Sequence, residues 1–272
     1  MESLFRCPNC GGTLTNQPGR LVCPAGHSFD VAKEHYVNLL PANQMHSKTP
    51  GDDKEMAAAR TRFLDGGWYG PLREELCKLV KSTNCPSPTL LDAGCGEGWY
   101  TAALSRTVAE LGGRTAGVDL SKPSVKKAGK RCPAAEIAVA SVYHLPLADE
   151  SVDILVDCFS PLAAEEFRRV LRPEGDFFYV VPGARHLWEL KSVLYENPYE
   201  NTVKTEEYPG FAHRGVTAVE YTFTLTDRQV IADLFRMTPY FWKTPKEGAA
   251  RLAELDTLTV TAQFHIHAFT RL

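Results

Sequence analysis

The chain has 272 residues, of which 44% are hydrophobic, and its 30 basic and 33 acidic side chains give a formal net charge of −3. This length allows one large domain or two smaller ones, and the charge excludes a chain-wide basic field that would bind nucleic acid non-specifically. No apolar run approaches the ~20 residues of a membrane span and segment 1–12 lacks the apolar stretch of a signal peptide, so we expect a cytoplasmic protein with no membrane partner.

The first predicted element is a metal site within residues 1–36. Cys7 and Cys10 form a C-x2-C pair, and twelve intervening residues separate them from Cys23 and His27, which form a C-x3-H pair. Two such pairs supply four soft ligands, which is what tetrahedral Zn²⁺ requires. Because four protein ligands leave no position for a catalytic water, we expect structural zinc. A histidine as the fourth ligand disfavours a redox pair or an iron–sulfur site.

The rest of the chain changes character twice. Residues 37–88 are expected to form a polar connector followed by helices at about 53–64 and 72–81. From residue 89 to residue 272, apolar runs typical of strands alternate with helical patterns, which predicts a doubly wound, Rossmann-like α/β sheet. The predicted strands lie at 89–94, 114–120, 135–141, 152–159 and 176–183, and the predicted helices at 100–111, 121–131 and 161–171. Two period-two patterns, at 218–225 and 257–269, predict a closing strand pair with helices at 227–236 and 245–253 between them.

A glycine-rich loop follows the first strand of this α/β pattern. Its motif residues are Asp92, Gly94, Gly96, Glu97 and Gly98. A strand that runs through glycines into a helix lets the backbone approach a ligand at the carboxyl end of the strand. Trp99 stands where a dinucleotide-binding loop needs its third glycine, and the Lys-Ser/Thr pair of a phosphate loop is missing. The D-x-G-x-G-x-G pattern resembles motif I of the class I S-adenosylmethionine-dependent methyltransferases.

That resemblance implies two further cofactor contacts. Asp119 ends the second strand, 21 residues after Gly98, and is expected to accept both ribose hydroxyls. Ser141 ends the third strand and is expected on the adenine side, just before the segment Leu145-Pro146-Leu147.

The flanking segments are similar to the RlmA-type 23S rRNA guanine-N1 methyltransferases. The similarity covers the cysteine–histidine site and segments 29–41, 59–65, 69–72, 182–187 and 237–239. It implies methyl transfer from S-adenosylmethionine to N1 of a guanine in a hairpin loop of 23S rRNA, an RNA-recognition role for the zinc-binding residues 1–36, and a homodimer. It also places Tyr69 and His186 at the methionine end of the cofactor.

Two side chains are candidates for the base that removes the N1 proton of guanine. Asp157 ends the fourth strand, where the fold places the acceptor, although a strand-end carboxylate is also a common solvated group. His186 lies just past the fifth strand and is the other candidate, so the catalytic base stays open.

Basic and aromatic side chains could contact RNA, since readable RNA bases lie in loops and single strands. The basic runs lie at 122–131 and 168–172, and each is also typical of a solvated helix face. Trp68, Trp99, Phe159 and Trp242 could stack an extruded guanine or pack in the core.

Two other functions fit parts of the sequence. A small-molecule methyltransferase of the ubiquinone type would share the cofactor motifs but would not need the zinc site. A non-catalytic zinc-ribbon RNA-binding protein would be expected to have lost Asp119 or the glycines, and the sequence retains them. We also expect loss of zinc to loosen residues 1–36 while leaving cofactor affinity nearly unchanged.

Overall fold

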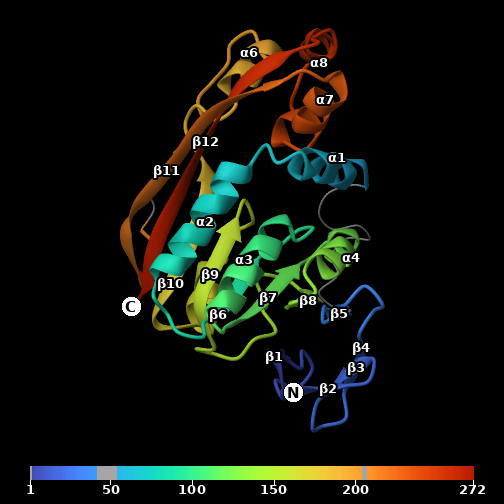
Figure 1. The fold of residues 1–272 in the computed structure, drawn as a ribbon, viewed down its shortest axis with the longest axis vertical. Coiled ribbons are helices and arrows are strands. Elements are labelled where there is room, and N and C mark those ends of the chain that lie inside the picture. Colours follow the sequence, from blue (N-terminus) through green and yellow to red (C-terminus); the bar gives the residue numbers. More distant parts are fainter. Residues whose placement is uncertain (1, 42–53, 204–206) are drawn as a thin grey trace.

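The structure is a computed structural model that describes residues 2–41, 54–203 and 207–272. It contains a four-stranded antiparallel sheet near the N-terminus and an eight-stranded mixed sheet (Figure 1). The small sheet has the order β1-β2-β3-β4, formed by Glu2–Arg6, Thr13–Gln17, Arg20–Val22 and Ser28–Asp30. The large sheet has the order β11-β12-β10-β9-β6-β7-β8-β5, formed by Phe211–Leu225, Leu258–Arg271, Leu171–Pro182, Val152–Cys158, Thr89–Ala93, Arg114–Asp119, Ala135–Val139 and Tyr36–Asn38.

The helices connect these strands as the alternating pattern predicts. They are α1 (Lys54–Asp65), α2 (Gly70–Ser82), α3 (Trp99–Glu110), α4 (Lys122–Arg131), α5 (Ala164–Val170), α6 (Trp188–Leu194), α7 (Arg228–Arg236), the 3₁₀ helix η2 (Pro239–Trp242) and α8 (Lys246–Ala253). The doubly wound fold class is therefore confirmed. Within the described ranges, no helix is long and apolar enough to cross a lipid bilayer.

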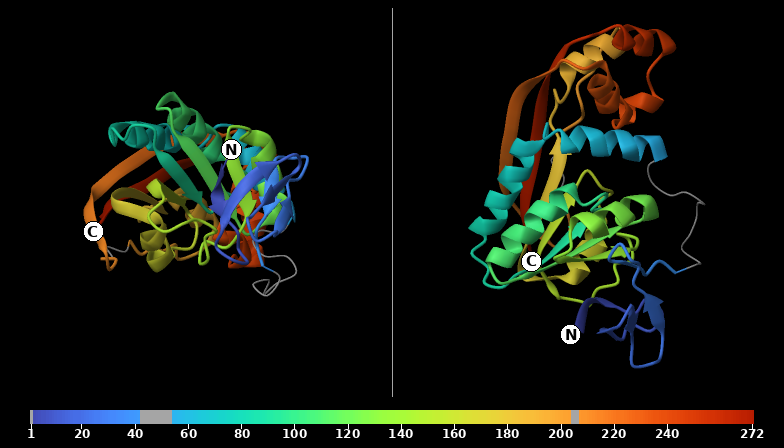
Figure 2. Two further views of the ribbon diagram at one scale, coloured as in Figure 1. Left: turned by 90° about the horizontal axis from the view of Figure 1, so that it is seen from below. Right: turned by 45° about the vertical axis from the view of Figure 1, so that its right-hand side comes forward.

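Different layers cover the two faces of the large sheet. On one face, apolar residues of α2 and α3 pack against alternate residues of β6, β9, β10 and β12, including Leu90, Val156 and Phe264. On the other face, Leu91, Leu155 and Phe177 pack with α5 and with apolar residues of the small sheet. Figure 2 shows these two layers from below the view of Figure 1. This alternation of successive strand residues is what a sheet buried on both faces requires.

The long strands β11 and β12 carry the chain well beyond the rest of the sheet. They pair antiparallel from Phe211↔Arg271 to Leu225↔Leu258, with a shift in register between His213 and Gly215. With α6, α7, η2 and α8 they form an upper lobe, which lies beyond the carboxyl ends of β9 and β10 (Figure 1). The predicted closing strand pair is confirmed, but β11 begins at Phe211, seven residues before the predicted start, because its first half is mostly exposed and lacks a clear apolar alternation.

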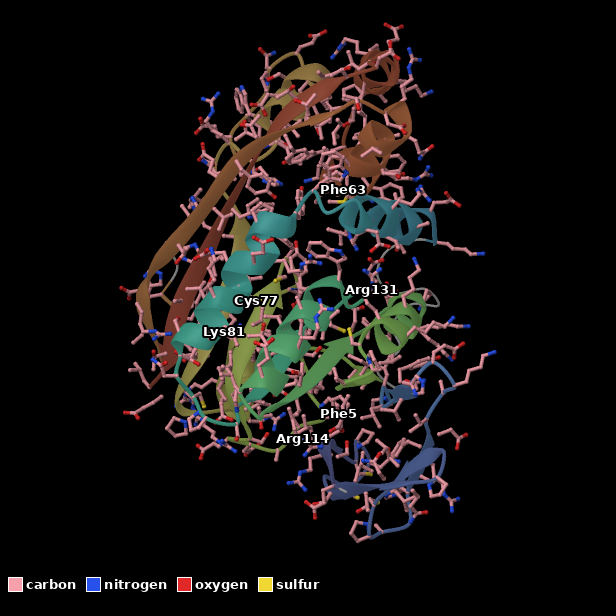
Figure 3. The ribbon with its side chains drawn as sticks, viewed as in Figure 1. Phe5, Phe63, Cys77, Lys81, Arg114 and Arg131 are labelled. Carbon is pink, nitrogen blue, oxygen red and sulfur yellow. The ribbon has the colours of Figure 1, made fainter. Side chains whose placement is uncertain are left out.

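The small sheet docks on the large sheet through β1. The Arg6 backbone N–H donates to the Pro146 carbonyl oxygen at 2.8 Å, and Phe5 forms an antiparallel bridge with Leu147. Phe5 is 1% exposed and lies at the junction of the two sheets, as Figure 3 shows. Two residues before Arg6 in β1, the Leu4 N–H donates to the carboxylate of Glu136 at 3.0 Å. The two sheets therefore share one apolar core.

Some boundaries differ from the sequence-based expectations. The strand β5 (Tyr36–Asn38) pairs with β8 and crosses the predicted boundary at residue 36. Its three residues are too few for a periodicity signal. The helix predicted at 161–171 is only Ala164–Val170, because Leu171 already pairs with Val152 of β9. Residues 42–53 of the predicted connector lie outside the described residues.

Candidate cofactor and zinc sites

The four predicted zinc ligands converge at the end of the small sheet. The ligand atoms of Cys7, Cys10, Cys23 and His27 all lie within 4.8 Å of one another. The Cys10 and Cys23 Sγ atoms are 3.6 Å apart, and His27 Nδ1 lies 3.5 Å from Cys7 Sγ and 3.3 Å from Cys23 Sγ. Tetrahedral zinc at ~2.3 Å from sulfur places neighbouring sulfurs about 3.8 Å apart. The donor set therefore fits a structural zinc ion.

Two tight turns bring these ligands together. The Gly11 N–H donates to the Cys7 carbonyl oxygen and the Gly26 N–H to the Cys23 carbonyl oxygen, at 2.8 and 2.9 Å. Gly11 and Gly26 have φ values of +71° and +85°, a conformation that glycine adopts without steric cost. The first turn is closed over four residues and the second over three, and each ends in a glycine with positive φ.

The predicted cofactor loop curls between β6 and α3. Gly94, Gly96 and Gly98 all have positive φ, at +82°, +54° and +79°. A Cβ atom on Gly94 would lie 2.2 Å from Cβ of Ser160, and one on Gly98 would lie 2.9 Å from Cα of Ala128. The loop is therefore closed to larger residues at these two positions. Gly98 precedes α3 without a side-chain cap, which leaves the amides of the first helical turn available to a ligand.

Asp119, the predicted ribose contact, holds this loop by hydrogen bonds. Its Oδ2 accepts from the Gly96 N–H at 3.0 Å and its Oδ1 from the Ser121 N–H at 2.7 Å. The carboxylate lies at the carboxyl end of β7, beside the loop, and is half-buried. The structure therefore joins two predicted cofactor residues in one hydrogen-bonded unit.

Asp92 lies beneath the loop and is 1% exposed. The Thr101 hydroxyl donates to its Oδ2 at 2.5 Å, while Oδ1 is buried without a hydrogen-bond partner among the described residues. Burial, assisted by the nearby charge of Asp119, raises the pKa of Asp92 to about 7, against the opposing effect of the Thr101 hydrogen bond. A buried oxygen without a partner next to a glycine loop fits a site that a polar ligand completes.

Glu97, the fourth predicted loop residue, makes other contacts. It is 5% exposed and pairs with Arg131 Nη2 at 3.3 Å and Lys127 Nζ at 4.0 Å on α4, and it also accepts from the Thr61 hydroxyl on α1. These contacts hold α1 against α4. The geometry favours a bracing role for Glu97 within the loop.

Ser141 follows β8 at the carboxyl edge of the sheet. Its hydroxyl accepts from the Tyr143 N–H at 3.2 Å, and it forms an isolated bridge with His144. The loop continues into Leu145 and Leu147, whose carbonyl oxygens both accept from Arg169, at 2.9 Å each. The predicted adenine-side residue therefore begins a loop that is tied to α5 and to β1.

Tyr69 and His186 meet in the core, 117 residues apart in sequence. Tyr69 Oη lies 3.5 Å from His186 Nε2, and His186 Nδ1 accepts from the Gln263 backbone N–H at 3.2 Å. Because Nδ1 accepts, the proton of the neutral ring lies on Nε2. Burial lowers the pKa of His186 to about 3. The ring is thus neutral with its acceptor nitrogen occupied, which favours a positioning role over that of a base.

Asp157, the other candidate base, is fully buried at the end of β9. Its Oδ1 accepts from the Ser160 backbone N–H at 2.9 Å, and its Oδ2 is buried without a partner among the described residues. Burial raises the pKa of Asp157 to about 8, despite hydrogen bonds from Ser160 that oppose the shift. A carboxyl group without exposed surface cannot contact a guanine that binds at the protein surface. This geometry therefore favours a structural role for Asp157.

The two basic runs are largely paired within the chain. On α4, Lys126 pairs with Glu34 at 3.3 Å and Arg131 with Asp65 at 2.6 Å. On the second run, Arg169 pairs with Asp149 at 2.7 Å, and Arg172 pairs with Asp153. Neighbouring carboxylates offset much of the positive charge that an RNA phosphate would meet. Much of the positive charge of both runs is therefore accounted for by surface ion pairs within the chain, without an RNA contact.

Some residues of the site gave no local sequence signal. Gln263 orients His186 through its backbone, and Phe264 packs 4.9 Å from Tyr69 and 4.7 Å from His186, measured between ring centroids. Both residues come from β12, whose alternation predicts a strand but not its neighbours. The sequence also gives no signal that Thr101 contacts Asp92. Its place in the first turn of α3, next to Asp92, follows only once the helix is known to start at residue 99.

Comparisons with known proteins agree with this geometry. Residues 5–48 match the family described as RlmA, N-terminal, a zinc ribbon, and residues 91–179 match the methyltransferase domain family. The 23S rRNA (guanine(748)-N(1))-methyltransferase of Streptomyces fradiae is 34% identical, with 94% of each chain covered. A Bacillus subtilis protein named provisionally as a 23S rRNA (guanine-N(1)-)-methyltransferase, without a stated position, is 33% identical, with 97% of this chain and 96% of the relative covered. The chain therefore belongs to the family of 23S rRNA guanine-N1 methyltransferases that carry an N-terminal zinc ribbon.

Proposed function

We propose that the chain transfers a methyl group from S-adenosylmethionine to N1 of a guanine in a hairpin loop of 23S rRNA. The observation that carries the proposal is that one chain combines a four-ligand zinc site with a glycine loop that is hydrogen-bonded to Asp119. Residues of the zinc site and of the strand before the loop pack in the same apolar core. A small-molecule methyltransferase explains the loop but not the zinc ribbon. A non-catalytic RNA-binding protein does not explain why the loop is intact.

The residues of the loop would hold the cofactor. Asp119 would accept the ribose hydroxyls, Ser141 would face the adenine, and Tyr69 and His186 would line the methionine end. S-adenosylmethionine supplies an activated methyl group when it is bound. The chain then has mainly to orient guanine N1 toward the methyl carbon, because alignment of reacting atoms supplies much of the rate in such transfers. With S-adenosylhomocysteine as the second product, the N1 proton passes to solvent, since the geometry favours neither Asp157 nor His186 as its acceptor.

The proposal assigns a zinc-dependent RNA-recognition role to residues 1–36 and a homodimer as the RNA-binding unit. Because carboxylates of the chain pair with Lys126, Arg131, Arg169 and Arg172, each basic run of one subunit offers less free charge to RNA phosphates than its composition suggests. A twofold dimer would double the contacts on one surface without raising the charge of either subunit. Sedimentation at micromolar concentration, together with the salt dependence of hairpin binding, tests this part. A monomer that methylates at full rate would contradict it.

Transfer of tritium from labelled S-adenosylmethionine tests the reaction itself. We expect label in unmodified 23S rRNA and none in quinone precursors or protein. A methyl group on N1 blocks base pairing, so reverse transcription of the product should stop at the modified guanine and identify it. Label in a quinone precursor alone would favour the small-molecule function, and no label in any acceptor would favour the non-catalytic one.

A further inference from the structure

An exposed aromatic ring stands at the carboxyl end of β9. Phe159 is 45% exposed, and its backbone has a φ of +61°, which L-residues other than asparagine and aspartate rarely adopt. A conformation of this kind persists only where the surroundings enforce it, and such positions cluster at ligand sites. The outward direction of this ring is therefore built into the fold.

The enforcing contacts come from both sides of Phe159. Its own N–H donates to the Val180 carbonyl oxygen of β10 at 3.3 Å, and the N–H of the following Ser160 donates to Asp157 Oδ1 at 2.9 Å. The Asp157 carboxyl thus closes the turn from residue 157 to residue 160. This gives the fully buried Asp157 a task that needs no exposed surface.

The ring lies beside both halves of the predicted cofactor site. Ser160 touches the glycine loop so closely that a Cβ atom on Gly94 would lie 2.5 Å from the Ser160 Oγ. On the other side, the Phe159 ring centroid lies 5.7 Å from that of Phe264, which in turn packs on Tyr69 and His186. The exposed ring is therefore placed between the loop and the predicted methionine end.

A guanine that is unstacked from an RNA loop needs a flat apolar surface beside the methionine end of the cofactor site. Proteins read unstacked bases by stacking them on aromatic side chains, and the energy does not depend on base identity. The other exposed aromatic rings of the described chain are Tyr143, Tyr199 and Trp242. Unlike Phe159, none of them makes a ring contact with Phe264.

We propose that Phe159 is the surface on which the target guanine stacks during methylation, and that Asp157 is a positioning residue that turns the Phe159 ring outward through the Ser160 amide. This inference rests on the proposed rRNA methylation. It separates the two candidate roles of Asp157, since a positioning residue needs only a hydrogen-bond acceptor and a base needs an ionisable group.

The test uses the full chain, S-adenosylmethionine and an unmodified hairpin RNA, with 2-aminopurine at the target position in a second RNA. Phe159→Leu keeps an apolar side chain but removes the ring. We expect a roughly fivefold to 150-fold rise in KM or Kd for the hairpin, from the usual contribution of one base–aromatic stack. Cofactor affinity should stay within twofold of wild type, and quenching of 2-aminopurine on binding should be lost. Phe159→Tyr should restore both signals.

Asp157 is tested by a matched pair of substitutions. Asp157→Asn keeps an acceptor oxygen for the Ser160 amide and should bind and quench the RNA as wild type does, whereas Asp157→Ala should behave like Phe159→Leu. Tyr199→Leu, which removes another exposed ring, serves as the control and should change neither signal.

Two results would overturn the inference while leaving the proposed function intact. One is a Phe159→Leu protein with wild-type hairpin affinity and quenching. The other is a Phe159→Tyr protein that fails to recover either signal while it remains folded and binds the cofactor. A wild-type protein that leaves every rRNA hairpin unmethylated instead overturns the proposed function, and the role of Phe159 with it.

Discussion

Truncation of Phe5 tests whether the zinc ribbon supports the cofactor site. The ring is 1% exposed and shares a core with Leu145 and Leu147, which follow the predicted adenine-side Ser141. An aromatic ring of this kind buries roughly 150–250 Å², worth about 4–6 kcal/mol at ~25 cal/mol per Å². Measured Phe→Ala substitutions in cores cost about 3–5 kcal/mol. We expect Phe5→Ala to lower the free energy of unfolding by a value in that measured range.

The same variant should also weaken S-adenosylmethionine binding, because β1 holds the loop through the Arg6–Pro146 hydrogen bond and the Phe5–Leu147 bridge. Urea denaturation gives the stability, calorimetry gives the affinity, and hydrogen exchange reports the protection of residues 141–147. Removal of zinc by a chelator should produce the same loss of protection. This expectation differs from the independence of zinc and cofactor that the sequence alone suggested.

A matched control comes from the upper lobe. Phe235 on α7 is 9% exposed and lies at the far end of the molecule from β1 (Figure 1). Phe235→Ala should destabilise the protein while leaving residues 141–147 protected. The reasoning is refuted if Phe5→Ala loses the expected stability yet keeps wild-type cofactor affinity and wild-type exchange at residues 141–147.

Three further predictions concern the cofactor loop and the buried acids. Asp119→Ala should weaken S-adenosylmethionine binding by about 1.5–3 kcal/mol, because it removes a charge-assisted acceptor and releases the Gly96 amide; an unchanged affinity in calorimetry would contradict this assignment. Gly94→Ala should abolish cofactor binding through its clash with Ser160 and its positive φ, and Ser160→Gly in the same chain should restore it only in part, which equilibrium binding of both variants measures. Asp157 has a raised pKa of about 8, so its neutral form stabilises the fold fully below the ordinary carboxyl pKa of ~3.9, and that contribution is lost as pH rises towards 8. Asp157→Asn should therefore be progressively more stable than wild type between pH 5 and pH 8 in urea titrations and should still methylate; equal stability at all pH values would show that the carboxyl is not buried in solution.

Much of the site could be predicted because its ligands are local in sequence. The zinc ligands sit in two short turns, and the glycine loop joins one strand to the next helix, so spacing alone defines both. The partners of His186 could not be predicted in this way. Tyr69 precedes β6 and Gln263 comes from β12, and only the insertion of β12 beside β10 brings them together.

The roles of charged residues were the hardest to predict. The sequence shows that the run at 122–131 is basic, but Glu34, Asp65 and Glu97, which pair with it, come from three other segments. Likewise, the burial of Asp157 depends on the layers above and below β9, which a strand pattern does not reveal. The net charge of a helix face therefore cannot be predicted from the residues of that helix alone, because carboxylates from distant segments pair with them in the fold.

The place of β12 in the sheet affects how the protein folds during synthesis. β12 lies between β10 and β11, yet residues 258–271 are made long after β10. Until they emerge from the ribosome, one edge of β10 has no neighbouring strand, and its buried residues include Phe177, Phe178 and Val180. Unpaired apolar edges readily join other chains. A nascent chain that pauses before residue 258 therefore leaves this strand edge open to association with other chains, even when its zinc ribbon and glycine loop have already formed.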